Sequence, residues 1–168
     1  MSRINDHSHF GRQRRGAIVP LLAVAVIAIF TLVALAIDIG LLAVARNHAQ
    51  NAADAAAMAG ARELNGDKQN NNNFAGAEPA ARAAAMANRI LGKSIQANQL
   101  TTEIGYYAYS SSLERFDPYF TGSKPDSENW SAVRTTITMD NPTFFARLLG
   151  VNSVPVTATA TAVHRPRD

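Results

Sequence analysis

The sequence contains no cysteine, which excludes a disulfide framework, a thiolate zinc site and a cysteine nucleophile. Aromatic residues are also scarce, at 7% of the chain. The formal net charge of +3 arises entirely within residues 1–16, which hold four arginines and one aspartate, and the rest of the chain is balanced. A nucleic-acid-binding face needs Lys and Arg clustered on a folded domain, so we expect no nucleic-acid partner.

Charged residues are absent between Arg15 and Asp38. The segment 17–37 consists almost entirely of Leu, Ile, Val, Phe and Ala, with Pro20 in its first turn. A helix of this length spans about 31 Å, which matches a hydrocarbon core of roughly 30 Å. The segment therefore predicts one transmembrane helix. The preceding basic residues, Arg12, Arg14 and Arg15, place the N-terminus in the cytoplasm and the C-terminal part outside by the positive-inside rule.

One processing event remains open from the residues alone. Ala43-Val44-Ala45 fits the small-x-small pattern of signal-peptide cleavage, although the apolar run is longer than a usual signal core of about 7–15 residues. We favour an uncleaved membrane anchor.

Alanine dominates the region that follows Asp38, and the first proline after it is Pro79. Because alanine is the best helix former, we expect one helix from Ala17 to Leu64. Small residues at helical spacing let another backbone approach, and polar residues a turn apart can bond a partner helix. The candidate packing and interaction residues are Ala36, Asp38, Gly40, Asn51, Ala52, Asp54, Ala56 and Gly60. The alternatives are that alanine merely raises helicity and that the polar residues are solvated.

The remaining sequence indicates a small mixed domain. We expect a second helix over 78–91 whose apolar stripe consists of Ala83, Met86, Ala87 and Ile90. Strands are expected over 104–109, 130–140 and 154–163, with a loop-rich stretch over 110–128. Asn141-Pro142 predicts the start of a short helix with Phe145, Leu148 and Leu149 inward. We expect seven aromatic residues to build the small core and its rim, with a ligand platform as the alternative: Tyr106, Tyr107, Tyr109, Phe116, Tyr119, Phe120 and Trp130.

The predicted fold class is α+β. Its order is a cytoplasmic basic arm (1–16), a transmembrane helix (17–37), a helical extension (38–64), a flexible loop (65–76) and a small external antiparallel-sheet domain with short helices (77–168). The sequence lacks a phosphate-binding loop and a nucleophile-elbow motif, and its histidines lie far from carboxylate clusters. We therefore expect no catalytic residue, no cofactor and no metal.

Two motifs resemble a known family. Arg14-Arg15-Gly16, the apolar span ending in Asp38-Ile39-Gly40, and the run from Gln50 to Ala61 are similar to the N-terminal region of TadE/TadG-like proteins of the Flp (Tad) pilus system. Residues 132–163, including Phe144 to Gly150, resemble the C-terminal region of short TadG-like forms. The resemblance implies a bacterial inner-membrane protein whose periplasmic or external part helps to assemble a type IV-like pilus used in adhesion and secretion. Pilins of such systems are cleaved after a glycine, and Gly16 resembles that glycine, but the fifth residue after it is Leu21 and not the usual glutamate.

The function expected on this basis is a non-enzymatic, single-pass component of pilus assembly that acts by helix packing and protein docking. Its expected partners are the membrane, other pilus-assembly membrane proteins or pseudopilins, and a second copy bound through the Ala-rich helix. An alternative is a membrane-anchored or released extracytoplasmic binding module that uses its aromatic-rich strands. An enzyme is a third and weaker hypothesis.

Overall fold

A computed structural model describes residues 18–66 and 68–164. Its longest element is helix α1, Ile18–Glu63, which has 46 residues and is about 69 Å long at 1.5 Å per residue. Pro20 lies in the first turn, where a missing N–H costs little. The helix ends at an Ala61 C=O to Leu64 N–H bond of 3.2 Å and at Gly66, whose φ is +81°. The predicted continuous helix is confirmed.

A four-stranded antiparallel sheet follows in the order β4-β3-β5-β6. Its strands are β3 (Leu100–Ser110), β4 (Arg115–Tyr119), β5 (Trp130–Pro142) and β6 (Ser153–Val163). Strands β1 (Arg89–Ile90) and β2 (Lys93–Ser94) form a separate small hairpin, turned by Leu91 and Gly92 with positive φ angles. The predicted α+β class with an antiparallel sheet is confirmed.

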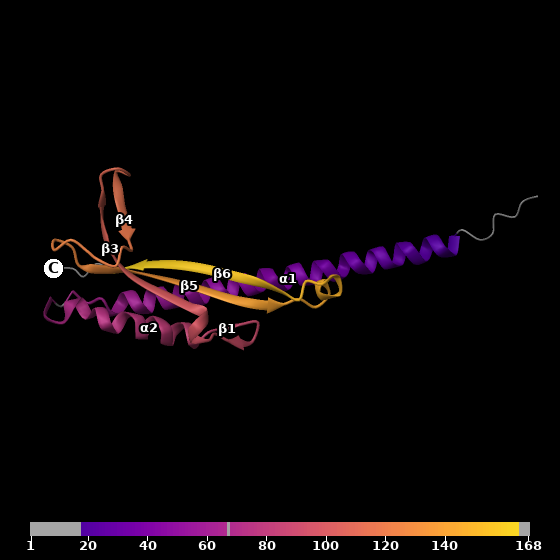
Figure 1. The fold of residues 1–168 in the computed structure, drawn as a ribbon, viewed down its shortest axis with the longest axis horizontal. Helices are drawn as coiled ribbons and strands as arrows, with labels where there is room; N and C mark the ends of the chain where they lie inside the picture. The colour runs from indigo at the N-terminus through magenta and orange to yellow at the C-terminus, as the bar shows by residue number, and fades with distance from the viewer. Residues whose placement is uncertain (1–17, 67, 165–168) are drawn as a thin grey trace, which may run out of the picture.

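The helices cover one face of this sheet (Figure 1). The later part of α1 packs against β5 and β6, and helix α2 (Phe74–Met86) packs against α1 and mainly against β3. The alternation predicted for β5 is confirmed, since Val133, Thr135 and Ile137 are completely buried. The opposite face carries threonines, and its hydroxyl pairs Thr136–Thr159 and Thr138–Thr157 are exposed. The core therefore lies between two helices and one side of the sheet.

The segment around α2 differs from its prediction. Residues 65–76, expected as a loop, contain the 3₁₀ helix Lys68–Asn73 and the first residues of α2. The helix therefore starts four residues before the predicted Glu78, and Pro79 lies inside it. Its buried positions are Ala77, Ala81 and Ala85. Of the predicted stripe, Ala83, Met86 and Ala87 are exposed, and Ile90 is buried but lies in β1, beyond the end of the helix. Because alanine occupies both faces of α2, its apolar periodicity did not identify the buried one.

A protruding arm is the second difference. Strand β4 and the end of β3 form a hairpin that stands away from the rest of the sheet (Figure 1), within a stretch expected to be loop-rich. The arm begins at a register shift between Gly105 and Tyr106. A Cβ on Gly105 would lie 2.0 Å from the Tyr119 carbonyl oxygen, so only glycine fits this bend.

Aromatic side chains line that arm, outside the core. Tyr106 stacks on Tyr119 with ring centroids 5.2 Å apart, and Phe116 contacts both Tyr107 and Tyr109 at 5.7 and 5.5 Å. Tyr109 and Phe116 are about half exposed. Of the seven aromatic residues predicted to build the core and its rim, Trp130 is the one that is buried. The rings of the arm lie away from the core, because they pack on each other across two strands.

Candidate assembly site at the base of the domain

Helix α1 has an apolar part that the other described residues do not cover. Its large side chains between Ile18 and Ile37 are each 41–76% exposed. This stretch is long and apolar enough to cross a membrane. A surface of this size and composition is not stable in water, so it indicates an apolar surrounding or a partner.

Small residues fill the later part of α1, where it meets the sheet. Ala45, Ala49, Ala52 and Ala56 have no exposed surface. A Cβ on Gly60 would lie 3.0 Å from both the Ala77 carbonyl oxygen and a Val133 methyl group. The sequence assigned Ala52, Ala56 and Gly60 to helix packing, and in the structure they pack within their own chain.

Asp38 lies where the two parts of α1 meet, and only 4% of it is exposed. Its carboxylate accepts hydrogen bonds from the backbone N–H groups of Phe144, Phe145 and Ala146 at 2.9, 3.0 and 2.7 Å. Burial by itself would raise the pKa of this carboxyl, but the three donors outweigh it and hold the pKa below its usual value. Asp38 therefore ties α1, as an ionised carboxylate, to a loop more than a hundred residues later.

That loop, residues 143–152, joins β5 to β6 and is called the tip loop below. It contains the 3₁₀ helix Ala146–Leu149, which ends at Gly150 with a φ of +89°. The sequence predicted a short helix opened by Asn141-Pro142, but these two residues are the last of β5, paired with Val154 and Ser153. The helix is correspondingly shorter and starts later.

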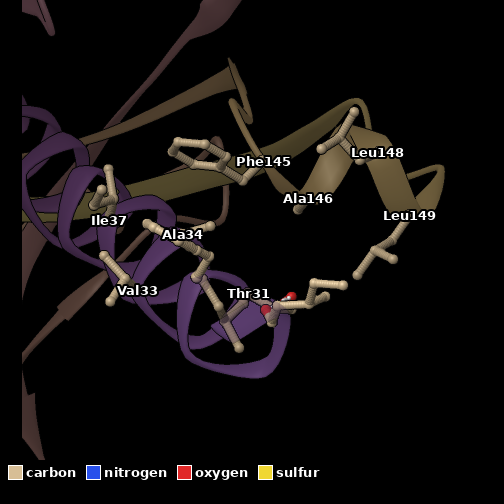
Figure 2. Close-up of a pocket in the computed structure, with 11 residues that line it drawn as sticks. Thr31, Val33, Ala34, Ile37, Phe145, Ala146, Leu148 and Leu149 are labelled. Atoms are coloured by element: carbon tan, nitrogen blue, oxygen red, sulfur yellow. Dashed lines mark hydrogen bonds between the residues drawn. The ribbon is translucent and has the colours of Figure 1, made fainter. Parts of the chain in front are cut away.

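The predicted inward orientation of the tip-loop side chains is wrong. Leu148 and Leu149 are 81% and 79% exposed, and Phe145 is 41% exposed. Figure 2 shows Phe145 and the two leucines beside α1, across an open cleft from Thr31, Val33, Ala34 and Ile37. The cleft has a volume of about 440 Å³, and its lining is almost entirely apolar.

Other predicted residues lie on the uncovered side of α1. Ala36, Gly40, Asn51 and Asp54 are all exposed, and a Cβ on Gly40 would meet nothing within 4 Å. The carboxylate of Asp54 accepts a bond from Gln50 Nε2 at 3.0 Å within the same helix. The topology residues Arg12, Arg14 and Arg15 lie outside the described residues.

The structure adds residues that the sequence interpretation missed. Thr135 Oγ1 donates to the Ala53 carbonyl oxygen at 2.7 Å and joins β5 to α1. His48 Nδ1 accepts from the Leu91 N–H at 3.3 Å. The tip loop itself had one usable signal, since four large apolar residues within Phe144 to Leu149 are unusual in a connection between two strands.

These features define a class of protein, an α+β domain built on the end of an uncovered apolar helix. Comparison with family models is more specific. The model described as Tad-like Flp pilus-assembly matches residues 59–162, and the one described as Flp pilus-assembly TadE/G-like matches residues 16–63. The chain belongs to this TadE/TadG-like family of Flp pilus-assembly proteins. Searches of curated proteins and of solved structures gave no match.

The family match confirms the resemblance found in the sequence, and its C-terminal part is longer than predicted, covering residues 59–162 in place of 132–163. Together the two models cover the apolar helix and the sheet domain. The families are involved in Flp pilus assembly as structural and assembly components. The chain is therefore a pilus-assembly protein with a helix suited to membrane anchoring.

Proposed function

We propose that this protein is a non-enzymatic component of Flp pilus assembly, held in the bacterial inner membrane by one pass of α1. Its N-terminal arm, with Arg12, Arg14 and Arg15, lies in the cytoplasm, and its sheet domain lies in the periplasm. It acts by docking other membrane proteins of the apparatus. The observation that carries the proposal is that one unbroken helix is uncovered over its apolar part and forms the core of a domain over its alanine-rich part.

This continuity has a mechanical consequence. A domain joined to its anchor by a flexible linker would rotate freely, because such linkers behave as random coils. Here α1 passes from the apolar part into the core with no break, and the bonds from Asp38 brace the point of entry. The domain is thus held at a fixed height and angle relative to the membrane, which suits a protein to which other subunits dock.

One side of α1 is available for such docking. Ala36, Gly40, Asn47, Asn51 and Asp54 recur at spacings that place them along one side of the helix, and all five are exposed. Ala36 and Gly40 are small and allow close approach of another helix. The polar side chains of the stripe, which follow them along α1, can form hydrogen bonds with that helix. We therefore place the contact with other pilus-assembly proteins, pseudopilins or a second copy on this stripe.

The absence of cysteine from the chain makes a direct test simple. Single cysteines at Gly40 and Asn51 would carry a photo-crosslinker in native membranes, with Thr138 on the exposed sheet face as the matched control. We expect pilus-apparatus proteins to be captured from the stripe positions and not from Thr138. Equal capture from all three positions, or none from the stripe, would refute the docking surface.

Topology has its own test. In spheroplasts, a membrane-impermeant maleimide should label a cysteine at Asn51 directly, and one at Ser8 only after lysis. The reverse pattern would place the domain in the cytoplasm and refute the proposed topology.

The protruding arm favours a second candidate, an extracytoplasmic binding module. Its aromatic rings are partly exposed on a hairpin that stands away from the sheet (Figure 1), and exposed aromatic residues are enriched at binding surfaces. Replacing Tyr109 and Phe116 with serine distinguishes the two candidates. Loss of piliation with normal crosslinking from the α1 stripe would assign the recognition step to the arm.

A further inference from the structure

The tip loop exposes more apolar surface than a water-exposed turn normally does. Five large apolar side chains of this loop are more than 40% exposed: Phe144, Phe145, Leu148, Leu149 and Val151. Its single charged residue is Arg147. Turns between strands are usually polar, so this composition indicates a non-aqueous neighbour.

The position of the loop identifies that neighbour. Figure 1 shows the loop beside α1 where the helix leaves the sheet, and the cleft between them is lined by α1 residues as far back as Ile27. Thr31, which faces Leu149 across the cleft, precedes Asp38 by seven residues, or about 10 Å along the helix. The leucines therefore lie level with the apolar part of α1.

The height of the membrane follows from the same residues. If Ile37 marks the edge of the hydrocarbon, Leu148 and Leu149 lie inside the leaflet on the domain's side. Raising the protein until these leucines reached water would also expose Leu32, Val33 and Leu35 of α1, which are large and uncovered. The apolar side chains of the loop and of α1 are both removed from water only when the loop lies in lipid.

The backbone of the loop is suited to that environment. Apolar surroundings demand that N–H groups be bonded within the protein. Asp38 accepts those of Phe144, Phe145 and Ala146, while those of Leu148, Gly150 and Val151 bond to carbonyl groups within the loop. Arg147 is exposed, and its long side chain can reach lipid headgroups while its stem stays in apolar surroundings.

We propose that the tip loop is embedded in the acyl-chain region of the leaflet on the domain's side, and that lipid acyl chains fill the cleft between the loop and α1. This inference rests on the membrane anchoring proposed above. Lipid is the occupant because the cleft lining continues without a break into the helix surface that faces lipid. The loop thus gives the protein a second membrane contact, and Asp38 links it to the first.

The test uses the full chain in vesicles of phosphatidylethanolamine and phosphatidylglycerol. Single cysteines at Leu148 and Leu149 carry an environment-sensitive fluorophore, and both side chains are so exposed that a label does not disturb the core. Leu32→Cys, which is 67% exposed and does not line the cleft, reports on the anchor, and Thr138→Cys reports on a water-exposed face. Quenching is measured with lipids that carry a doxyl group on the upper part of the acyl chain.

We expect the labels at Leu148, Leu149 and Leu32 to show blue-shifted emission, with an intensity several-fold higher than that of the label at Thr138, and strong quenching by doxyl lipids. Quenching at Leu32 with a water-like signal at both loop positions would overturn the inference and leave the anchor intact. Blue-shifted but unquenched loop labels would mean that protein covers the loop, which also overturns it. A water-like signal at Leu32 would instead refute the anchoring on which the inference depends.

Discussion

The two parts of α1 differ in the size of their apolar side chains. Residues 18–37 carry large aliphatic and aromatic side chains that nothing in the described chain covers, whereas residues 45–61 carry alanine or glycine at every buried position. Both parts are helical for the same local reason, which is a lack of interior breakers. Large side chains maximise transfer into lipid, and small ones let a sheet and a second helix approach the backbone.

The two parts therefore gain stability from different surroundings. The first needs a bilayer, and the second needs β5, β6 and α2. Asp38 stands at the border, where it is the one buried charged residue in the described chain. Substitutions that exchange the character of the two parts should break the comparison, and each has a matched position in the other part.

The largest effect is expected from charge in the first part. Val26→Arg with Ile29→Arg should abolish membrane insertion, because each arginine near the centre of the span costs about 2.5–3.5 kcal/mol and the whole span gains roughly 4–8 kcal/mol. Carbonate extraction of membranes measures the retained fraction. Val44→Arg with Met58→Arg, at exposed apolar positions of the second part, should remain in the membrane. Equal retention of both double variants would contradict the assignment.

The next effect is overpacking of the second part. Gly60→Leu should lower the free energy of unfolding by about 1–3 kcal/mol or more, because the first added carbon already meets the Ala77 carbonyl and Val133. Denaturant unfolding in detergent micelles measures it. Gly40→Leu is the control, with open space at the Cβ and a gain of up to about 1 kcal/mol in helix propensity. Similar losses of unfolding free energy at both glycines would contradict the difference in packing between Gly60 and Gly40.

Much of this contrast could be predicted from the sequence. The uninterrupted helix and the alternating strands β5 and β6 follow from local propensity and period, and the structure agrees with both. The orientation of Phe145, Leu148 and Leu149 could not, because the interpretation assumed that apolar side chains of the domain turn away from water. Next to a membrane helix the opposite side is also apolar, so pattern alone does not distinguish the two directions.

Contacts between residues far apart in the sequence could not be predicted either. The sequence places Asp38 at the end of a membrane span. Nothing near it in the sequence indicates that its carboxylate accepts hydrogen bonds from the N–H groups of Phe144, Phe145 and Ala146. The buried face of α2 was undetermined because alanine lies on both faces. In each case the deciding contact joins segments that only the folded chain brings together.

A pH-dependent effect follows from Asp38. Since its folded-state pKa is lowered, its stabilising contribution is complete above the unfolded-state value of about 3.9 and is lost as the pH falls through the lower folded-state pKa. Asp38→Asn removes this titration. The difference in thermal stability between the natural protein and the variant should be constant above about pH 5 and should shrink below about pH 3.9.

Hydrogen exchange gives a local reading of the same contact. The amides of Phe144, Phe145 and Ala146 should exchange faster in Asp38→Asn, while amides in the middle of β5 stay protected. A stability difference that does not change with pH, together with unchanged exchange at these three amides, would remove Asp38 as the link between the two parts.

The smallest effect concerns the single hydroxyl that joins the sheet to the second part of α1. Thr135→Val keeps the shape of a fully buried side chain but removes the 2.7 Å bond to the Ala53 carbonyl oxygen. The loss should be about 1 kcal/mol, the usual net contribution of one hydrogen bond. Thr138→Val on the exposed face should change stability by less than about 0.5 kcal/mol, since its hydroxyl partner is solvated. If the two variants unfold alike in denaturant, the contact between sheet and helix depends on the fit of small side chains alone, and the second part of α1 needs no polar bond to hold its sheet.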